Sequence, residues 1–300
     1  MKIAFSFAGQ GVQYVGMGKE LYENSSTFKN VFDNLDKELI DICFNGPSEV
    51  LNDTCNAQPL ICATSIGIAL ALKEKGITPS YSAGLSLGEY SALAFNDVLS
   101  VKDTLDIVKQ RGNIMSKALP SGTTGMAAVI NSDVETINSV INEIGKLEIA
   151  NYNSPKQIVI TGDINSIDKS IEKFKELKVR AIKLNVSGAF HSSYLNDASI
   201  KLNEVLNKYE FKKPSNPVVF NVSGKQEDEN VIELLTKQIK SSVLFLQSIE
   251  YMINNGVDTF IEIGPGKTLS SFVGQTSKEV KVYTVESLES IEGLVDILNG

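Results

Sequence analysis

Between Gly122 and Ser187 the sequence changes rhythm, and this stretch constrains the fold more than any other. Short runs of apolar and β-branched residues alternate there with two segments whose apolar residues recur at helical spacing. The resulting order, strand, helix, strand, strand, helix, strand, is that of a ferredoxin-like module with an antiparallel sheet. We therefore predict an inserted subdomain over residues 122–187.

The segments on either side of this insert alternate between strand and helix. Before it, residues 2–7 have β character, and residues 59–75 are apolar on nearly every face, as in a buried helix. After the insert, strands are expected at residues 217–223, 258–266 and 280–286. This alternation predicts an α/β fold, in which residues 1–121 and 188–300 form a mostly parallel sheet covered by helices.

The charge balance narrows the choice of partners. A formal net charge of -8 and a pI near 4.9 argue against nucleic acid as the main partner, because the phosphate backbone is repelled at long range. An acidic partner protein would therefore have to meet a local basic patch.

Cysteine usage and hydropathy indicate the cellular compartment in which the protein is expected. Cys43, Cys55 and Cys62 are odd in number and lack CxxC spacing, so neither a disulfide framework nor a zinc site is expected. The first residues contain too short an apolar run for a signal peptide. The longest apolar run, residues 59–72, is shorter than the ~20 residues that cross a bilayer. We expect a cytoplasmic protein.

The stretch "GLSLGEY" at residues 84–90 places a serine between two glycines. Preceded by a strand and followed by a helix, this pattern is typical of a nucleophile elbow, which exposes the serine Oγ and turns the next N–H toward an oxyanion. The alternative is a strand-to-helix bend that is packed by glycines and has no chemistry. The pattern alone leaves both open for Ser86.

Two further residues bear on this choice. A nucleophilic serine needs a base, and His191 is the one histidine of the chain. Arg111 is one of only two arginines in a chain that otherwise uses lysine, and its planar fork suits a carboxylate. The alternatives are a structural histidine and a surface arginine in an ordinary ion pair.

Two glycine-rich stretches do not match nucleotide-binding motifs. Gly9, Gly11, Gly16 and Gly18 follow a strand without the G-x-G-x-x-G spacing. "GPGKT" at residues 264–268 ends like a P-loop but lacks the first glycine, so ATP binding is not predicted.

Motifs along the whole chain together resemble the malonyl-CoA:acyl carrier protein transacylase family. In order they read "FAGQGVQYVGMG", "QPLICATSIGIALALKEKGI", "GLSLGEYSAL", "QRGNIM", "NYNSPKQIVITG", "VSGAFHS" and "IEIGPGKTL". Several independent motifs in the right order are far more specific than G-x-S-x-G alone.

The resemblance implies an α/β-hydrolase-like large subdomain with a ferredoxin-like insert, and it implies a role for each site residue. Ser86 would attack the malonyl thioester, and His191 would act first as base and then as acid. The backbone N–H groups of Gln10 and Leu87 would hold the oxyanion, and Arg111 would pair with the malonyl carboxylate.

The implied reaction is ping-pong. Malonyl-CoA acylates the serine, CoA leaves, and the phosphopantetheine thiol of acyl carrier protein takes the malonyl group. No metal or redox cofactor is needed, and a monomer is expected. Because the carrier is acidic, docking requires a basic rim, for which Lys178, Arg180 and Lys183 are the candidates, the alternative being an ordinary solvated edge.

Three positions depart from the usual family pattern. Leu85 stands where histidine is usual beside the nucleophile, and Ala8 replaces a proline in the oxyanion loop. Leu244 occupies a position that relatives often fill with glutamine or arginine. There the family orients the catalytic histidine through a backbone carbonyl, so Leu244 is expected to do the same.

Other functions remain open on the sequence. A free-standing acyltransferase supplying a modular polyketide synthase would use the same residues. An acyl hydrolase that removes stalled groups would not need a carboxylate clamp, and a catalytically inactive binding module would not need Ser86, His191 and Arg111 together.

Overall fold

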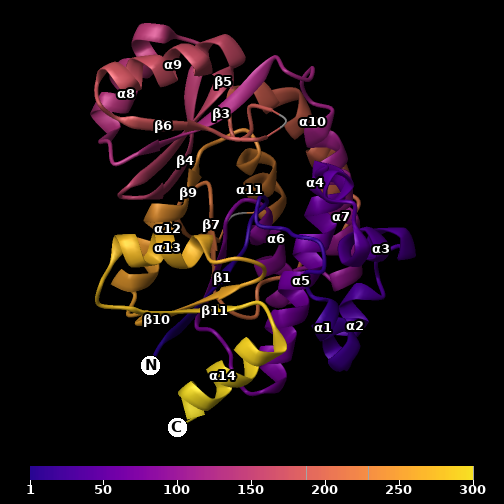
Figure 1. Ribbon diagram of the computed structural model, residues 1–300. Coiled ribbons are helices and arrows are strands. Elements are labelled where there is room, and N and C mark those ends of the chain that lie inside the picture. The colour runs from indigo at the N-terminus through magenta and orange to yellow at the C-terminus, as the bar shows by residue number, and fades with distance from the viewer. Residues whose placement is uncertain (187, 229, 300) are drawn as a thin grey trace.

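The computed structural model describes residues 1–186, 188–228 and 230–299 and contains two sheets (Figure 1). The larger sheet has six strands in the order β11-β10-β1-β2-β7-β8. Its neighbours pair in parallel except β7 and β8. The strands are β1 (Ile3–Phe7), β2 (Tyr81–Gly84), β7 (Val218–Phe220), β8 (Lys225–Gln226), β10 (Thr259–Ile263) and β11 (Lys281–Val285). The mostly parallel sheet expected from the alternation is confirmed.

Alternation along β1 shows how this sheet is buried on both faces. Phe5 and Phe7 belong to the core that contains α5 (Thr54–Glu74). Ala4, on the opposite face, packs with α12 (Phe245–Asn254) and α13 (Thr268–Thr276). Successive side chains of a strand point to opposite faces, so a strand with helices on both sides is buried throughout, as all five residues of β1 are.

Helix α5 is the central helix of the larger core. It is 21 residues long, and its buried side chains face all directions because α2, α6 and α7 pack around it (Figure 1). By length and composition it could cross a membrane, but 83% of its most apolar window is buried inside the protein, as in a core helix. The start predicted at Pro59 was wrong, since the helix begins at Thr54 and Pro59 lies inside it.

Ten further helices belong to the described residues outside the insert. They are α1 (Lys19–Asn24), α2 (Ser26–Phe32), α3 (Lys37–Asn45), α4 (Ser48–Asn52), α6 (Leu87–Phe95), α7 (Val101–Ser116), η1 (Ser193–Leu195), α10 (Asn196–Leu206), α11 (Val231–Gln238) and α14 (Leu288–Asn299). Of these, α6, α7 and α11 carry or support site residues.

The second sheet has the strand order β6-β3-β5-β4-β9. Its strands are β3 (Thr124–Ile130), β4 (Leu147–Ser154), β5 (Gln157–Asp163), β6 (Arg180–Lys183) and β9 (Val243–Leu244). The first four pair antiparallel, and α8 (Val134–Ile144) and α9 (Ile164–Glu176) pack on one face through their own apolar core. This is the arrangement expected of a βαββαβ module.

Strand β9 was not predicted, and it ties the second sheet to the rest of the chain. It pairs in parallel with β4, so residues 243–244 join a sheet otherwise made from residues 124–183. Two residues give no periodicity signal, which explains why the sequence did not reveal the strand. The boundary at Ser187 lies outside the described residues, and the subdomain limits 122 and 187 stay a proposal.

The "GPGKT" stretch packs under the loop that follows β1. A Cβ added at Gly264 would lie 2.5 Å from Ser65 Oγ and 3.0 Å from the Ala8 Cβ. The Ala8 N–H donates to the Ile263 carbonyl at 3.0 Å, a bond that a proline at this position could not make. Gly264 therefore allows close packing against Ala8.

Candidate active site

The expected strand, turn and helix surround Ser86. Strand β2 ends at Gly84 and α6 begins at Leu87, and Ser86 between them has φ 53° and ψ −99°. A Cβ added at Gly84 would lie 1.9 Å from the Gly88 carbonyl carbon, and one at Gly88 would lie 2.1 Å from the Phe7 carbonyl oxygen. Only glycine fits at either position. The positive φ of Ser86 costs about 1–3 kcal/mol, which the surrounding packing must offset.

His191 lies against Ser86, although 105 residues separate them. Its Nε2 is 2.8 Å from Ser86 Oγ, and its Nδ1 is 2.9 Å from the backbone carbonyl oxygen of Gln238. A carbonyl can only accept, so Nδ1 carries the proton in the neutral ring and Nε2 accepts from the serine hydroxyl. This tautomer is the one a general base requires.

The prediction that Leu244 orients the histidine was wrong. The Leu244 carbonyl accepts from the Ser248 hydroxyl at 2.9 Å, and its N–H donates to the Asn221 carbonyl at 2.8 Å. Leu244 immediately precedes α12, so its carbonyl points into the first turn of that helix. The histidine is held instead at the end of α11, where Gln238 binds its ring and the Ile239 carbonyl accepts its backbone N–H at 3.1 Å.

Arg111 is 1% exposed and also contacts the serine. Its Nη2 donates to Ser86 Oγ at 3.1 Å and to Gln238 Oε1 at 3.0 Å, while Nη1 donates to Gln58 Oε1 at 2.9 Å. Its guanidinium carbon lies 5.3 Å from the centroid of the Tyr90 ring. Arg111 Nε has no hydrogen-bond partner among the described residues. The surface-arginine alternative is excluded by this burial.

Gln10 and Leu87 lie in the two segments that meet at the elbow. Leu87 is the first residue of α6, where backbone N–H groups have no acceptor within the helix. The loop that carries Gln10 touches the elbow, since a Cβ added at Gly9 would lie 2.7 Å from the Leu85 carbonyl oxygen. We retain the two amides as the proposed oxyanion hole.

A family model described as acyl transferase domain matches residues 4–291. The chain belongs to the acyl transferase family. It is similar to the malonyl CoA-acyl carrier protein transacylase of Bacillus subtilis (strain 168), with 44% identity over 308 residues, covering 99% of this chain and 97% of that one. The protein of the same name from Staphylococcus aureus (strain MRSA252) is 38% identical, and the alignment covers 97% of this chain and 98% of that one.

Solved structures agree with this assignment. The malonyl CoA-acyl carrier protein transacylase of Clostridium perfringens matches this acyl transferase with a TM-score of 0.96 and 45% identity, covering 100% of this chain and 98% of that one. A malonyl-transacylase solved in complex with a type II PKS acyl-carrier protein matches with a TM-score of 0.94 and 32% identity, covering 99% and 100%. The resemblance found in the sequence and the α/β fold class are confirmed.

The structure of this acyl transferase adds four buried polar residues that the sequence did not single out: Gln58, Glu89, Asn221 and Gln238. Gln238 contacts all three of the predicted residues. It binds His191 and Arg111 as described above, and its Nε2 also donates to the Ser86 carbonyl at 2.9 Å. A signal existed for Asn221, a polar residue just after a parallel strand, and for Gln58, at the start of an apolar run. Gln238 and Glu89 had none.

Burial dominates the electrostatics of the site. It lowers the pKa of His191 to about 4, although the hydrogen bond that Nδ1–H donates to the Gln238 carbonyl opposes this shift, and the charge of Arg111 acts in the same direction as burial. It raises the pKa of Glu89 to about 8 despite the bond from the Asn221 N–H and the charge of Arg111. At neutral pH His191 is therefore uncharged, as a base must be.

The pKa of His191 predicts the pH dependence of this acyl transferase. The rate of Ser86 acylation at pH 5.5 should stay within about twofold of that at pH 7.5, whereas an ordinary histidine of pKa ~6.5 would lose about tenfold. Rapid-quench measurement at both pH values distinguishes the cases, and a tenfold fall would mean that the ring is solvated. Since the folded pKa is below the unfolded one, the stability associated with His191 is complete above pH ~6.5 and declines as the pH falls toward 4.

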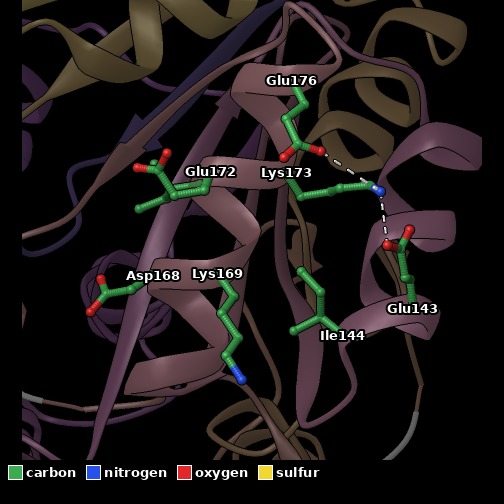
Figure 2. Close-up of a pocket in the computed structure, with 8 residues that line it drawn as sticks. Glu143, Ile144, Asp168, Lys169, Glu172, Lys173 and Glu176 are labelled. Carbon is green, nitrogen blue, oxygen red and sulfur yellow. Dashed lines mark hydrogen bonds and ion pairs between the residues drawn. The ribbon is translucent and has the colours of Figure 1, made fainter.

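A hollow of about 640 Å³ between α8 and α9 lies apart from these residues (Figure 2). Within it Lys173 Nζ lies 2.8 Å from Glu143 Oε1 and 3.9 Å from Glu176 Oε2, in ordinary surface ion pairs. Asp168 also lines the hollow and pairs with Lys183 of β6 at 2.6 Å. The hollow is lined by residues of α8 and α9, and Lys183 pairs with Asp168 from β6, so these charges do not belong to the elbow.

Proposed function

We propose that the protein transfers malonyl groups from malonyl-CoA to the phosphopantetheine thiol of an acyl carrier protein through an ester on Ser86. The observation that carries this proposal is that an imidazole and a guanidinium both contact the same serine oxygen inside a buried site. The first is the group that activates a nucleophile, and the second is the group that binds a free carboxylate. The names of the relatives support the same substrates.

In the first half-reaction, Ser86 Oγ attacks the thioester carbonyl while its proton passes to His191 Nε2. The proton on Nδ1 stays in its bond to the Gln238 carbonyl, which stabilises the imidazolium that forms. The N–H groups of Gln10 and Leu87 donate to the oxyanion, each worth ~3 kcal/mol by analogy with hydrolases. The intermediate then collapses, the CoA thiolate takes the proton from His191, and the malonyl ester remains on Ser86.

The second half-reaction uses the same groups in reverse roles. His191, neutral again, takes the proton of the phosphopantetheine thiol, and the thiolate attacks the ester carbonyl. Collapse of the second tetrahedral intermediate returns the proton to Ser86 Oγ and releases the malonyl thioester of the carrier. Because a thiol must compete with water for the ester, the burial of His191 and Arg111 favours transfer over hydrolysis.

Arg111 gives the site its preference for a dicarboxylic acyl group. In the malonyl ester, the carboxylate carbon is three bonds from Ser86 Oγ. The carboxylate can therefore reach the guanidinium, which in the free protein donates to this oxygen. A carboxylate there would accept two parallel N–H bonds. An acetyl group would leave a buried charged donor unpaired, at a cost of ~1–3 kcal/mol or more.

Intact mass measurement tests the function directly. Incubation with malonyl-CoA should add one malonyl group to the wild-type chain, and addition of holo acyl carrier protein should move that group to the carrier. Ser86→Ala should gain no adduct. A wild-type chain that hydrolyses malonyl-CoA without charging the carrier would identify a hydrolase, and one that shows neither adduct nor turnover would identify a binding module.

The pathway follows from which carrier is charged. We propose fatty acid synthesis, which fits the names of the relatives. The solved relative in complex with a type II PKS acyl-carrier protein keeps polyketide supply as the second candidate. Comparing kcat/KM for a fatty-acid carrier and a polyketide carrier decides between them.

We propose that the carrier docks at the edge of the second sheet. Lys178 and Arg180 are exposed, and β6, which Arg180 begins, is an edge strand. Lys183 of the same strand is exposed but already pairs with Asp168. A basic edge would attract an acidic carrier, an effect that salt screens.

Charge reversal at this edge should weaken the carrier's binding. Arg180→Glu is expected to raise KM for the carrier by about three- to tenfold at low salt, with kcat and the KM for malonyl-CoA unchanged. Lys281→Glu, the same charge change on β11 of the other sheet, serves as the matched control. Equal effects of the two variants would mean that Arg180 lies on an ordinary solvated edge.

We also propose that the protein acts as a monomer in a reducing, cytoplasmic setting. Cys43, Cys55 and Cys62 are free, and burial raises the pKa of the Cys43 and Cys62 thiols to about 12, which keeps them protonated and unreactive. Sedimentation under reducing conditions checks the oligomeric state.

A further inference from the structure

We propose that Asn221 is a positioning residue that fixes the backbone of the Ser86 elbow and thereby sets the rate at which Ser86 is acylated. The inference rests on the proposed function, since acylation of Ser86 is its readout. Asn221 follows β7, the neighbour of β2 in the larger sheet, and its side chain reaches the elbow from the carboxyl end of these strands.

The side chain of Asn221 bridges the two peptide groups on either side of Leu85. Its Oδ1 accepts from the Ser86 N–H at 2.7 Å, and its Nδ2 donates to the Gly84 carbonyl at 2.7 Å. The residue is 0% exposed, so water does not compete for these bonds. The turn that carries the nucleophile is thus held at its entry and at its exit by one rigid amide.

The chemistry of the two contacts requires an amide. The Ser86 N–H can only donate and the Gly84 carbonyl can only accept, so one side-chain atom must accept and the other must donate. This also fixes which way the Asn221 amide is turned. A carboxylate would place a second acceptor against the Gly84 carbonyl, and an aliphatic side chain would leave both backbone groups unpaired.

The backbone of Asn221 is held as firmly as its side chain. Its N–H donates to Glu89 Oε2 at 2.6 Å, and its carbonyl accepts from the Leu244 N–H at 2.8 Å. Glu89 lies in the first turn of α6, directly after the elbow. The contacts therefore close a ring from Ser86 through Asn221 to Glu89 and back along the helix.

This ring has a consequence for catalysis. Because Asn221 occupies the Ser86 N–H, that amide is taken out of competition for the oxyanion, and the next one, of Leu87, is left to serve it. The bond also holds the Ser86 backbone at φ 53°, the angle that presents Oγ to both His191 and Arg111. Loss of the bridge would let the turn relax away from these partners.

Asn221→Ala tests the proposal. Its acylation rate constant, measured by rapid quench and intact mass, should fall about 10²-fold, as expected when a reacting group shifts by about 1 Å, while the Kd for malonyl-CoA changes less than about threefold. The matched control is Asn96→Ala, which removes another fully buried asparagine whose Nδ2 donates to the Ala92 carbonyl at 2.7 Å, away from Ser86. That control should acylate at the wild-type rate.

The pH dependence of acylation in Asn221→Asp distinguishes a positioning role from a purely structural one, which would not change with pH. A protonated carboxyl has one donor and one acceptor, like the amide, so lowering the pH from 7 to 5.5 should restore the ratio of variant to wild-type acylation rates by about tenfold. The titratable and charged groups at the elbow change little over this range, and the wild type shares any change, which therefore cancels in the ratio. Glu89, with a pKa of about 8, is mostly protonated, His191, with a pKa of about 4, is mostly neutral, and Arg111 is charged.

Three results would contradict the role proposed for Asn221. A folded Asn221→Ala that acylates like the wild type, or an Asn96→Ala that loses as much, overturns the proposal. So does an Asn221→Asp to wild-type ratio that is independent of pH. If the alanine variant does not fold, the aspartate variant, equal in shape to asparagine, carries the test. Failure of the wild type to gain a malonyl group would instead count against the proposed function.

Discussion

His191→Ala is expected to lower the rate of Ser86 acylation by malonyl-CoA by about 10⁴-fold, the upper range for loss of a general base. His191 Nε2 lies 2.8 Å from Ser86 Oγ. The sequence contains no second histidine that could replace it as the base. A serine hydroxyl whose proton has no acceptor is a poor nucleophile at neutral pH. Single-turnover acylation followed by intact mass measures the loss.

Binding of malonyl-CoA and a second substitution at the same position serve as controls for this variant. Asparagine at position 191 keeps polar contact with the site but offers no base, so His191→Asn should lose about as much rate as His191→Ala. Both variants should bind malonyl-CoA with a Kd close to that of the wild type. A residual rate within tenfold of the wild type in either variant would show that another group deprotonates the serine.

Arg111→Ala should reverse the preference of the site for malonyl over acetyl groups. Removing a buried partner of a carboxylate costs about 3–5 kcal/mol, so kcat/KM for malonyl-CoA should fall by about 10²–10⁴-fold. Acetyl transfer should fall far less or rise, because the acetyl group never engaged the guanidinium. The ratio of the two kcat/KM values, measured on one preparation, gives the change in selectivity.

One further variant shows whether the planar fork of the guanidinium or its charge matters. Arg111→Lys keeps the charge but loses the planar pair of donors, so it should retain only part of the malonyl preference. Thermal melts are needed alongside, because Arg111 also holds Gln58 and Gln238 in place. Unchanged selectivity in a folded Arg111→Ala would refute the carboxylate clamp.

The sequence predicted the local features of this protein well. Strand β1, both helices of the insert and the strand, turn and helix around Ser86 follow from periodicity and from the two glycines, because these features depend on neighbours a few residues away. The start of α5 was misplaced at Pro59, since its first turn, residues 54–58, is mostly polar and the apolar run begins later than the helix itself. The two-residue strand β9 was too short to leave a pattern.

What the sequence by itself determined is the chemistry available: one elbow serine, one histidine and a rare arginine in a chain that folds as an α/β protein. What only the tertiary structure decided is which groups meet. Gln238 holds His191 where Leu244 was expected to, and Asn221 bridges the elbow from 135 residues away. The physical reason is that a hydrogen bond depends on distances of about 3 Å set by packing in three dimensions, which spacing along the chain does not encode.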